Sequence, residues 1–376
     1  MRRGLFALAA IGAAAALSIL FYPSSEQAAR AQVSTGYAGS ATCATCHADV
    51  AKRWSRTIHS NMVRPAMREN IRGDLTKPNA PDLRAFDFVY VLGGWYKEER
   101  YVIRRDGELI LTPHEWNPVK QTYTIRRTAA GELEFTNWRT ACVGCHTTGY
   151  DIQTRAWAEL NIGCESCHGP GARHAAAPSK ANTIVNRSAE ACGQCHIRGT
   201  DNATRFGFPT GYRLGRPDTL LSTFTIIPMT DAASIFPDQR TSRRHRQQFI
   251  DFMKSKHYAA NVTCVACHDA HAGTEIAYSQ LKKPKAILCN TCHQTQVSRF
   301  AIHTGHKPWQ VTCADCHTPR VIADGTVSTH TFRTLSPADS LKYGEDRMAN
   351  SCTYKCHADQ NAAWAQRYLV EKGIGR

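Results

Sequence analysis

Cys164-Glu165-Ser166-Cys167-His168 is the stretch that decides the fold, because its pattern, Cys-x-x-Cys-His, recurs along the chain. Seven copies have the regular spacing, and an eighth, Cys352-Thr353-Tyr354-Lys355-Cys356-His357, has one extra residue between its cysteines. The other six regular copies are Cys43/Cys46/His47, Cys142/Cys145/His146, Cys192/Cys195/His196, Cys264/Cys267/His268, Cys289/Cys292/His293 and Cys313/Cys316/His317. Together the eight copies use all 16 cysteines of the 376-residue chain.

This motif is typical of covalent haem attachment. Two thiols one helical turn apart can each form a thioether bond to one edge of a haem, and the adjoining histidine reaches the iron as its proximal ligand. Zinc sites do not require a histidine after each cysteine pair, thioredoxin-like dithiols occur singly, and haem attachment leaves no thiol for disulfides. The sequence therefore predicts eight covalently bound c-type haems, of which the site at Cys352 and Cys356 is the least regular.

Nine of the 17 histidines lie outside the motifs. A low-spin haem takes a second axial ligand, usually His or Met, so nine histidines for eight irons predict mostly bis-histidine haems. We expect the second ligands among His59, His174, His257, His271, His303, His306 and His330. His114 follows Pro113 at a strand end, and the sequence does not decide whether it is an iron ligand. His245 lies within Arg243-Arg244-His245-Arg246 and is expected to be exposed to solvent. Met62 and Met67 are alternative ligands, although methionine more often serves packing.

The segment between the first two motifs has a different character. Residues 86–92 and 101–111 are rich in strand-forming residues, and Asp106-Gly107 divides the second run as a hairpin turn would. Residues 123–125 and 134–136 favour two further strands. We therefore predict a mostly α and irregular multihaem cytochrome c fold with a small antiparallel β insertion between the first and second motifs.

The motif positions divide the chain into five parts. The predicted parts are a leader (1–31), the first motif with the β insertion (32–140), motifs two to four (141–200), a connecting segment (201–262) and motifs five to eight (263–376). Within them, residues 201–245 are expected to form a long loop, and helices are expected at 246–256 and 360–372. So many haems in one chain would form much of its core, and we expect the haem-free polypeptide not to fold.

The leader has the features of a targeting segment. Arg2 and Arg3 precede an uncharged, mostly apolar run over residues 4–22, and Ala29-Arg30-Ala31 offers a cleavage site. A signal peptide and an uncleaved membrane anchor both fit the length of this run. In either case the rest of the chain is predicted to lie outside the cytoplasm, in the periplasm or at the cell surface.

The formal net charge of +15 would suggest an anionic partner such as nucleic acid. Eight haems, however, bring about 16 negative propionate charges, which offset the surplus. We interpret the excess of Lys and Arg as partners for propionates and predict no binding of nucleic acid.

The sequence resembles multihaem cytochromes related to the tetrahaem cytochrome that accepts electrons from hydroxylamine oxidoreductase. The resemblance is carried by Tyr37-Ala38-Gly39-Ser40 and by residues 54–59, 163–171 and 264–271, and extends from residue 37 to about 320. It implies bis-histidine haems in parallel and perpendicular pairs, a role in electron transport, and His59, His174, His257 and His271 as second ligands. Eight motifs exceed the four of that relative, and the expanded eighth motif departs from its pattern, which leaves the ligand pairing in the last third open.

Electron transfer between redox partner proteins is the preferred function, and it needs no catalytic residue. The alternative is an oxidoreductase that acts on a small nitrogen or sulfur compound, such as nitrite, hydroxylamine or tetrathionate, at one haem with an open iron position. The haems of His47 and His357 are the first choices for such an opening, although no Cys-x-x-Cys-Lys motif is present. A subunit of an extracellular cytochrome filament is a third alternative.

Overall fold

The computed structural model describes residues 36–77, 86–95, 97–216, 218–271, 279–323 and 325–374. The predicted leader at residues 1–31 lies outside the described residues. Within these ranges, every helix is too short or too polar to cross a bilayer. All 16 cysteines and all 17 histidines fall within the described ranges.

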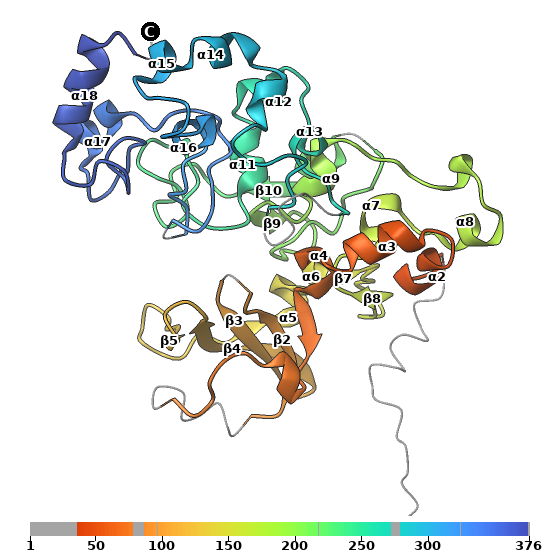
Figure 1. Cartoon of the computed structure of the whole chain (residues 1–376). Coiled ribbons are helices and arrows are strands. Elements are labelled where there is room, and N and C mark those ends of the chain that lie inside the picture. The colour runs from red at the N-terminus through yellow and green to blue at the C-terminus, as the bar shows by residue number, and fades with distance from the viewer. Residues whose placement is uncertain are drawn as a thin grey trace, which may run out of the picture.

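The predicted β insertion is present as a six-stranded antiparallel sheet, which forms a lobe of its own beneath the rest of the molecule in Figure 1. Five strands pair in the order β1-β2-β3-β4-β5, and β6 also pairs with β4. Asp106 and Gly107 have φ angles of 51° and 77°, as a tight hairpin between β3 and β4 requires. The strands are β1 Val63–Pro65, β2 Phe88–Gly93, β3 Glu99–Arg105, β4 Glu108–Asn117, β5 Thr122–Ile125 and β6 Thr136–Asn137.

Helices in the rest of the chain are short, and irregular segments join them. Before the third motif lie α2 Ser40–Ala44, α3 Ala48–Trp54, α4 Ile58–Asn61, the 3₁₀ turn η1 Arg68–Asn70, α5 Trp138–Ala141 and α6 Val143–His146. From the third motif to the fifth come α7 Glu165–His168, α8 Ala172–Ala176, η3 Lys180–Asn182, α9 Ala189–Gly193, α10 Thr219–Thr223, α11 Gln248–Phe252, α12 Lys256–Ala259 and α13 Cys264–Cys267. The last part holds η4 Cys289–Thr291, α14 Gln294–Ser298, α15 Phe300–Thr304, α16 Cys313–His317, α17 Pro337–Tyr343 and α18 Ala362–Glu371.

Two small ladders complete the secondary structure and correct one prediction. β7 Thr147–Thr148 pairs with β8 Glu159–Leu160, and β9 Gly199–Asp201 pairs with β10 Phe224–Ile226. The segment expected to be a loop at 201–245 therefore contains β10 and α10. The physical reason is burial, because Leu220 and Phe224 are 0% and 1% exposed and anchor this segment in a hydrophobic cluster.

Of the two predicted helices, one is confirmed and the other is divided into two. The helix expected at 360–372 is confirmed as α18, which the Asn361 side chain caps by accepting a hydrogen bond from the Trp364 N–H. The helix expected at 246–256 is divided into α11 and α12. Ser255 has extended backbone and its side chain accepts from the Tyr258 N–H, so it begins a new helix instead of continuing the old one.

The apolar core is split into separate clusters instead of one interior. One cluster lies under the sheet, one joins α9 to α11, and one lies beside α17. In Figure 1 the first motif, in α2, and the eighth, before α18, lie at opposite ends of the molecule. The predicted fold class, mostly α and irregular with a small antiparallel insertion, is confirmed.

Candidate haem sites

Each Cys-x-x-Cys-His motif folds into one tight turn that brings its histidine back over the first cysteine. In the motifs that begin at Cys43, Cys164, Cys192 and Cys289, the histidine N–H donates to the carbonyl of that cysteine at 3.0 Å. The eighth motif closes the same turn despite its extra residue, since His357 N–H donates to the Cys352 carbonyl at 3.1 Å. Lys355 accommodates the insertion with a left-handed φ of 70°. The irregular motif therefore also brings its histidine back over its first cysteine, through a turn that is one residue longer.

Seven of the motif histidines face a histidine from outside the motifs. The ring centroids of these pairs lie 5.8–6.3 Å apart. An imidazole nitrogen binds a metal at about 2.0 Å and lies about 1.1 Å from its ring centroid, so two imidazoles on one iron are about 6.2 Å apart. The pairs are His47 with His174, His196 with His59, His168 with His271, His268 with His330, His293 with His257, His317 with His303 and His357 with His306.

Hydrogen bonds at Nδ1 fix which nitrogen of these rings can bind a metal. Nδ1 of His168 lies 2.9 Å from the Ile184 carbonyl, and Nδ1 of His306 lies 2.8 Å from the Thr304 carbonyl. A carbonyl oxygen only accepts, so Nδ1 carries the proton and Nε2 keeps its lone pair. The rings of His174, His268 and His330 make the same kind of contact with backbone carbonyls.

Burial keeps several of these rings in the neutral form that binds metals. Burial, together with the neighbouring imidazoles, lowers the pKa of His59 and His330 to about 4. Burial also lowers the pKa of His146 to about 4. These histidines are therefore uncharged at neutral pH, as an iron ligand must be.

His146 is the motif histidine that lacks an imidazole partner among the described residues. Its ring contacts Trp138 with centroids 5.8 Å apart.

Two histidines outside the motifs, His114 and His245, face no motif histidine among the described residues. His114 is 1% exposed within strand β4, where it pairs with Ile125. His245 contacts Arg198, whose Nε donates to the His245 carbonyl at 3.0 Å and whose Nη2 lies 3.4 Å from the His245 ring.

Two expectations are corrected by these positions. His245 is half-buried and lines the central cavity, so the prediction that it is exposed to solvent was wrong. Of the basic run around it, Arg244 and Arg246 line the cavity, and Arg243 is exposed to solvent. The haems of His47 and His357, the first choices for an open iron, each have an imidazole opposite, from His174 and His306.

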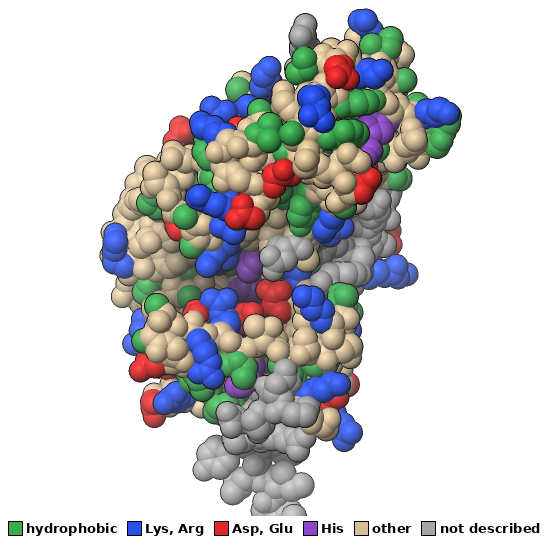
Figure 2. Space-filling model, turned by 90° about the vertical axis from the view of Figure 1, so that its left-hand side faces the viewer, with side chains coloured by type: hydrophobic (Ala, Val, Ile, Leu, Met, Phe, Trp, Pro, Cys, Tyr) green, Lys and Arg blue, Asp and Glu red, His purple; other side chains and the backbone are tan. Residues whose placement is uncertain are grey.

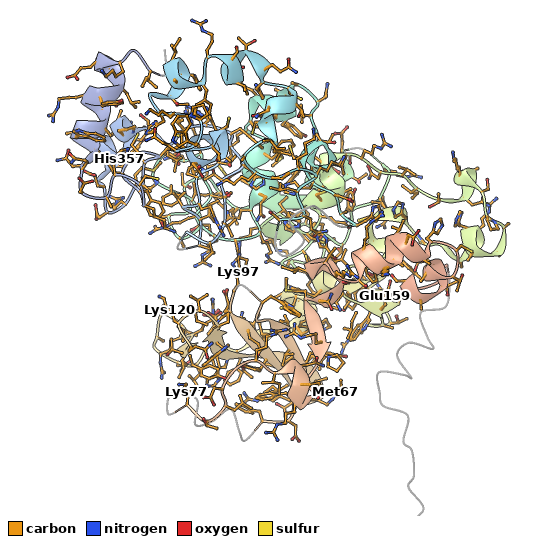
Figure 3. All side chains as sticks on the ribbon, viewed as in Figure 1. Met67, Lys77, Lys97, Lys120, Glu159 and His357 are labelled. Atoms are coloured by element: carbon orange, nitrogen blue, oxygen red, sulfur yellow. The ribbon has the colours of Figure 1, made fainter. Side chains whose placement is uncertain are left out.

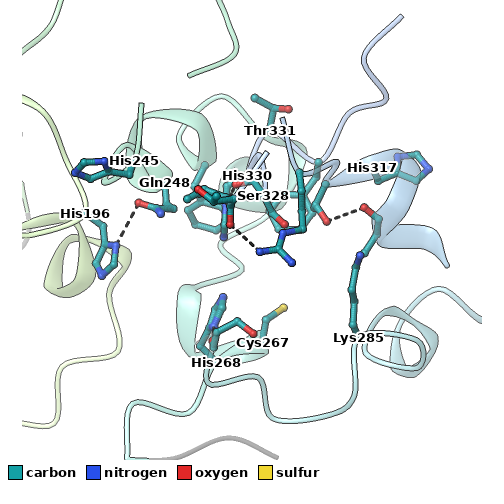
Figure 4. Close-up of a pocket in the computed structure, with 18 of the residues that line it drawn as sticks. His196, His245, Gln248, Cys267, His268, Lys285, His317, Ser328, His330 and Thr331 are labelled. Carbon is teal, nitrogen blue, oxygen red and sulfur yellow. Dashed lines mark hydrogen bonds between the residues drawn. The ribbon is translucent and has the colours of Figure 1, made fainter. Parts of the chain in front are cut away.

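One continuous cavity of about 2950 Å³ lies between the sheet and the C-terminal part of the chain. The cysteines and histidines of the second motif and of motifs four to eight line it, together with Cys167 of the third. Figure 4 shows His196, His268, His317 and His330 around one part of this space, and Figure 2 shows histidine side chains in a hollow at mid-height on one face. The protein leaves one connected space for a series of large cofactors.

Contacts between motifs give their order in space. Cys164 N–H donates to Ser40 Oγ at 3.1 Å beside the first motif, and Gln194 Nε2 donates to the Ser166 carbonyl at 3.3 Å between the fourth and third. Ser351 Oγ donates to the Cys316 carbonyl at 2.9 Å between the eighth and seventh. Cysteine side chains are in contact between motifs one and three (Cys43, Cys164), two and four (Cys145, Cys195), four and five (Cys192, Cys264) and six and seven (Cys289, Cys313).

Comparisons with known proteins agree with this site. Residues 112–169 match the family described as cytochrome c554 and c-prime, and residues 257–298 match the doubled CXXCH motif. Over 113 residues the chain is 28% identical to the multiheme cytochrome MtrA of Shewanella baltica strain OS185, a match that covers 30% of this chain and 28% of that protein.

Among solved structures, the outer cell wall cytochrome OcwA superposes with a TM-score of 0.77 and 24% sequence identity, over 90% of this chain and 87% of that one. An undecaheme cytochrome from the S-layer of Carboxydothermus ferrireducens superposes with a TM-score of 0.49 and 20% identity, over 90% and 60%. The likeness to OcwA establishes the fold. The motifs and the two family matches make the chain similar to multihaem c-type cytochromes, electron-transfer proteins whose cofactor is haem c.

Proposed function

We propose that the chain carries eight haems, one on each motif, and conducts electrons along them between protein partners outside the cytoplasm. The observation that carries the proposal is the set of seven imidazole pairs at the spacing of two ligands on one iron. When bound, haem supplies a one-electron couple, and the residues of this chain hold each iron and tune its potential through ligands, burial and charge.

In this assignment seven haems are bis-histidine. The proximal ligands are His47, His168, His196, His268, His293, His317 and His357, and the second ligands are His174, His271, His59, His330, His257, His303 and His306 in the same order. His114 is left out of the ligand set, because it lies inside the sheet lobe in strand β4. The haem on Cys142 and Cys145 has His146 as its proximal ligand.

The contacts between motifs support a chain of haems in the order one, three, four, five, six, seven, eight, where Cys267 of motif five interacts electrostatically with Cys292 of motif six. Motif two contacts motif four and therefore forms a side branch. Cys46 and Cys356, at the two ends of this order, are exposed. Cys292 of motif six is exposed as well. We infer from their place at the two ends of the order that haems one and eight are the points at which partner proteins would deliver and accept electrons, and Figure 3 shows His357 near one end of the molecule.

Several finer points belong to the same proposal. The relation to the tetrahaem partner of hydroxylamine oxidoreductase is supported by the match of residues 112–169 to the cytochrome c554 family. A periplasmic or cell-surface location is supported by the leader sequence and by covalent haem, which is attached after export. Lys and Arg side chains are scattered over the face drawn in Figure 2, and the pairing of such residues with propionates is part of the proposal.

Intact-mass analysis of the exported protein, combined with electron paramagnetic resonance (EPR) of the oxidised form, tests the proposal. We expect a mass increase of eight haems and low-spin ferric signals from at least seven irons. Stopped-flow reduction should then show electrons reaching all haems from one donor. A bare polypeptide, fewer than eight haems, or several high-spin irons would contradict it.

The second candidate function, an oxidoreductase at an open haem, is favoured by one observation. His146 faces no second imidazole among the described residues, and its haem would therefore differ from the other seven.

A further inference from the structure

The short helix α11, Gln248–Phe252, contacts histidines of two different haem sites. Gln248 reaches His196, the motif histidine of motif four, and Asp251 reaches His330, which faces the motif histidine of motif five. Motifs four and five are themselves neighbours through the contact between their cysteines. A single turn of helix therefore connects ligands of two adjacent haem sites.

His196 is held both at its ring and at its backbone. Its Nδ1 lies 3.2 Å from Gln248 Oε1, and the Phe249 N–H donates to its carbonyl at 3.0 Å. A histidine that binds iron through Nε2 keeps its proton on Nδ1, so this ring donates to the amide oxygen. Figure 4 shows Gln248 directed at His196. In motifs three and five the acceptor is a backbone carbonyl, at 2.9 and 2.6 Å, whereas motif four uses a side chain that substitution can remove.

Asp251 holds its histidine through the backbone. Its side chain is buried, with 0% of the residue exposed. One carboxylate oxygen accepts the Ser242 N–H at 2.8 Å, and the other accepts the His330 N–H at 3.1 Å. Both oxygens act as acceptors, as those of an ionised carboxylate do. Asp251 thus fixes the chain at His330 and places a buried negative charge beside it.

The two haem sites differ in the angle between their facing imidazoles. The rings at motif four, His196 and His59, are inclined at 85° to each other. The rings at motif five, His268 and His330, are inclined at 21°. In a low-spin ferric haem, near-perpendicular imidazole planes give one EPR signal at large g, and near-parallel planes give a rhombic spectrum. The two sites can therefore be distinguished in one sample.

We infer that α11 is a positioning element for haems four and five, in which Gln248 orients His196 and Asp251 fixes His330. The inference rests on the proposed attachment of haems to these motifs. By accepting from Nδ1–H, Gln248 makes the imidazole a stronger electron donor, which stabilises ferric iron and lowers the potential of haem four. The buried charge of Asp251 favours the ferric state of haem five in the same way. Because motif two joins the series at motif four, this helix acts where the branch meets the main path.

An EPR-monitored redox titration of the holoprotein tests the role of Gln248. Gln248→Leu removes the acceptor at nearly constant size, and we expect the reduced-to-oxidised ratio of haem four at a fixed potential to rise about tenfold, or about 59 mV. Gln248→Glu should shift the same signal the opposite way, because a carboxylate is a stronger acceptor. Haem six is an internal reference, since its rings are inclined at 76° and should give a second large-g signal that does not move. Unchanged large-g signals in both variants, or equal shifts of the two, would refute the role of Gln248.

Asp251→Asn tests the second contact of the helix. The variant loses the charge and has one oxygen left for two N–H donors, so we expect one rhombic signal to move to higher potential while the large-g signals stay in place. Ile250→Val is the matched packing control, because Ile250 is buried on the same helix, lies outside the cavity lining and loses only one methylene. Shifts of the same size in Ile250→Val would show that packing alone is responsible and would overturn the inference.

Intact mass separates failure of this inference from failure of the proposed function. Fewer than eight haems on the unsubstituted protein would contradict the proposed function. Eight haems on the protein and on its variants, with potentials that do not move, would contradict only the role of α11.

Discussion

Removal of the haems should unfold this protein, and the cavity gives the size of the effect. An empty internal space costs about 24 cal/mol per Å³ in measured proteins. For a cavity of about 2950 Å³ this is on the order of 70 kcal/mol, an upper bound because water enters a space of this size. Even a tenth of that value, about 7 kcal/mol, equals the whole net stability of a typical domain. We therefore expect the haem-free chain to have no stable native state.

The assay compares the holoprotein with chain expressed without its leader in cells that lack haem attachment. Near-ultraviolet circular dichroism and hydrogen exchange should show a loss of fixed packing in the haem-free chain and rapid exchange in most segments. The sheet lobe, which has its own cluster of Val91, Tyr101, Trp116 and Tyr123, is the part most able to keep some protection. A cooperative thermal transition with a native near-ultraviolet spectrum in the haem-free chain would refute the reasoning.

Further predictions concern single sites. His303→Ala should convert one more iron to high spin, measured by EPR, whereas Ile302→Ala, on an exposed neighbour, should not; an unchanged low-spin count would remove His303 from the ligand set. Glu165→Gln should lower the free energy of unfolding by about 2–4 kcal/mol in denaturant titrations, because this buried carboxylate accepts three backbone N–H bonds at 2.6–2.8 Å; a loss no larger than that of the exposed control Glu132→Gln would contradict this. Lys355→Gly should raise the melting temperature slightly, since the left-handed backbone of Lys355 costs a non-glycine residue about 1 kcal/mol; a lower melting temperature would mean that the Lys355 side chain matters more than its backbone.

Local patterns in the sequence predicted local structure well. The spacing of Cys164, Cys167 and His168 lies within one turn, so the chemistry and the fold of each motif follow from a few neighbouring residues. The sheet was also predictable, because alternating apolar residues and the Asp106-Gly107 pair specify a hairpin without help from distant segments. The segment around Phe224 was missed because its burial depends on partners such as Phe249 that lie elsewhere in the chain.

The pairing of histidines could not be predicted from spacing. His168 faces His271 and His59 faces His196, across more than a hundred residues of chain, so only the assembled fold selects the partner. His245 was misjudged for a related reason. A run of basic residues normally marks a solvated surface, and Arg243 is indeed exposed, but His245 and Arg246 face a cavity that anionic groups would enter.

The number of histidines also failed to predict that His146 has no facing imidazole among the described residues. Nine non-motif histidines for eight irons suggested a full set of second ligands. Two of the nine, His114 and His245, make other contacts, so the second ligand is missing at the motif of His146. An iron on the direct path between the two ends gains nothing from an open position, since each ligand exchange slows electron transfer through it. A branch does not carry that penalty. The placement of motif two beside motif four, off the proposed series from motif one to motif eight, would allow one chain to combine a conducting path with the open haem of the second candidate function.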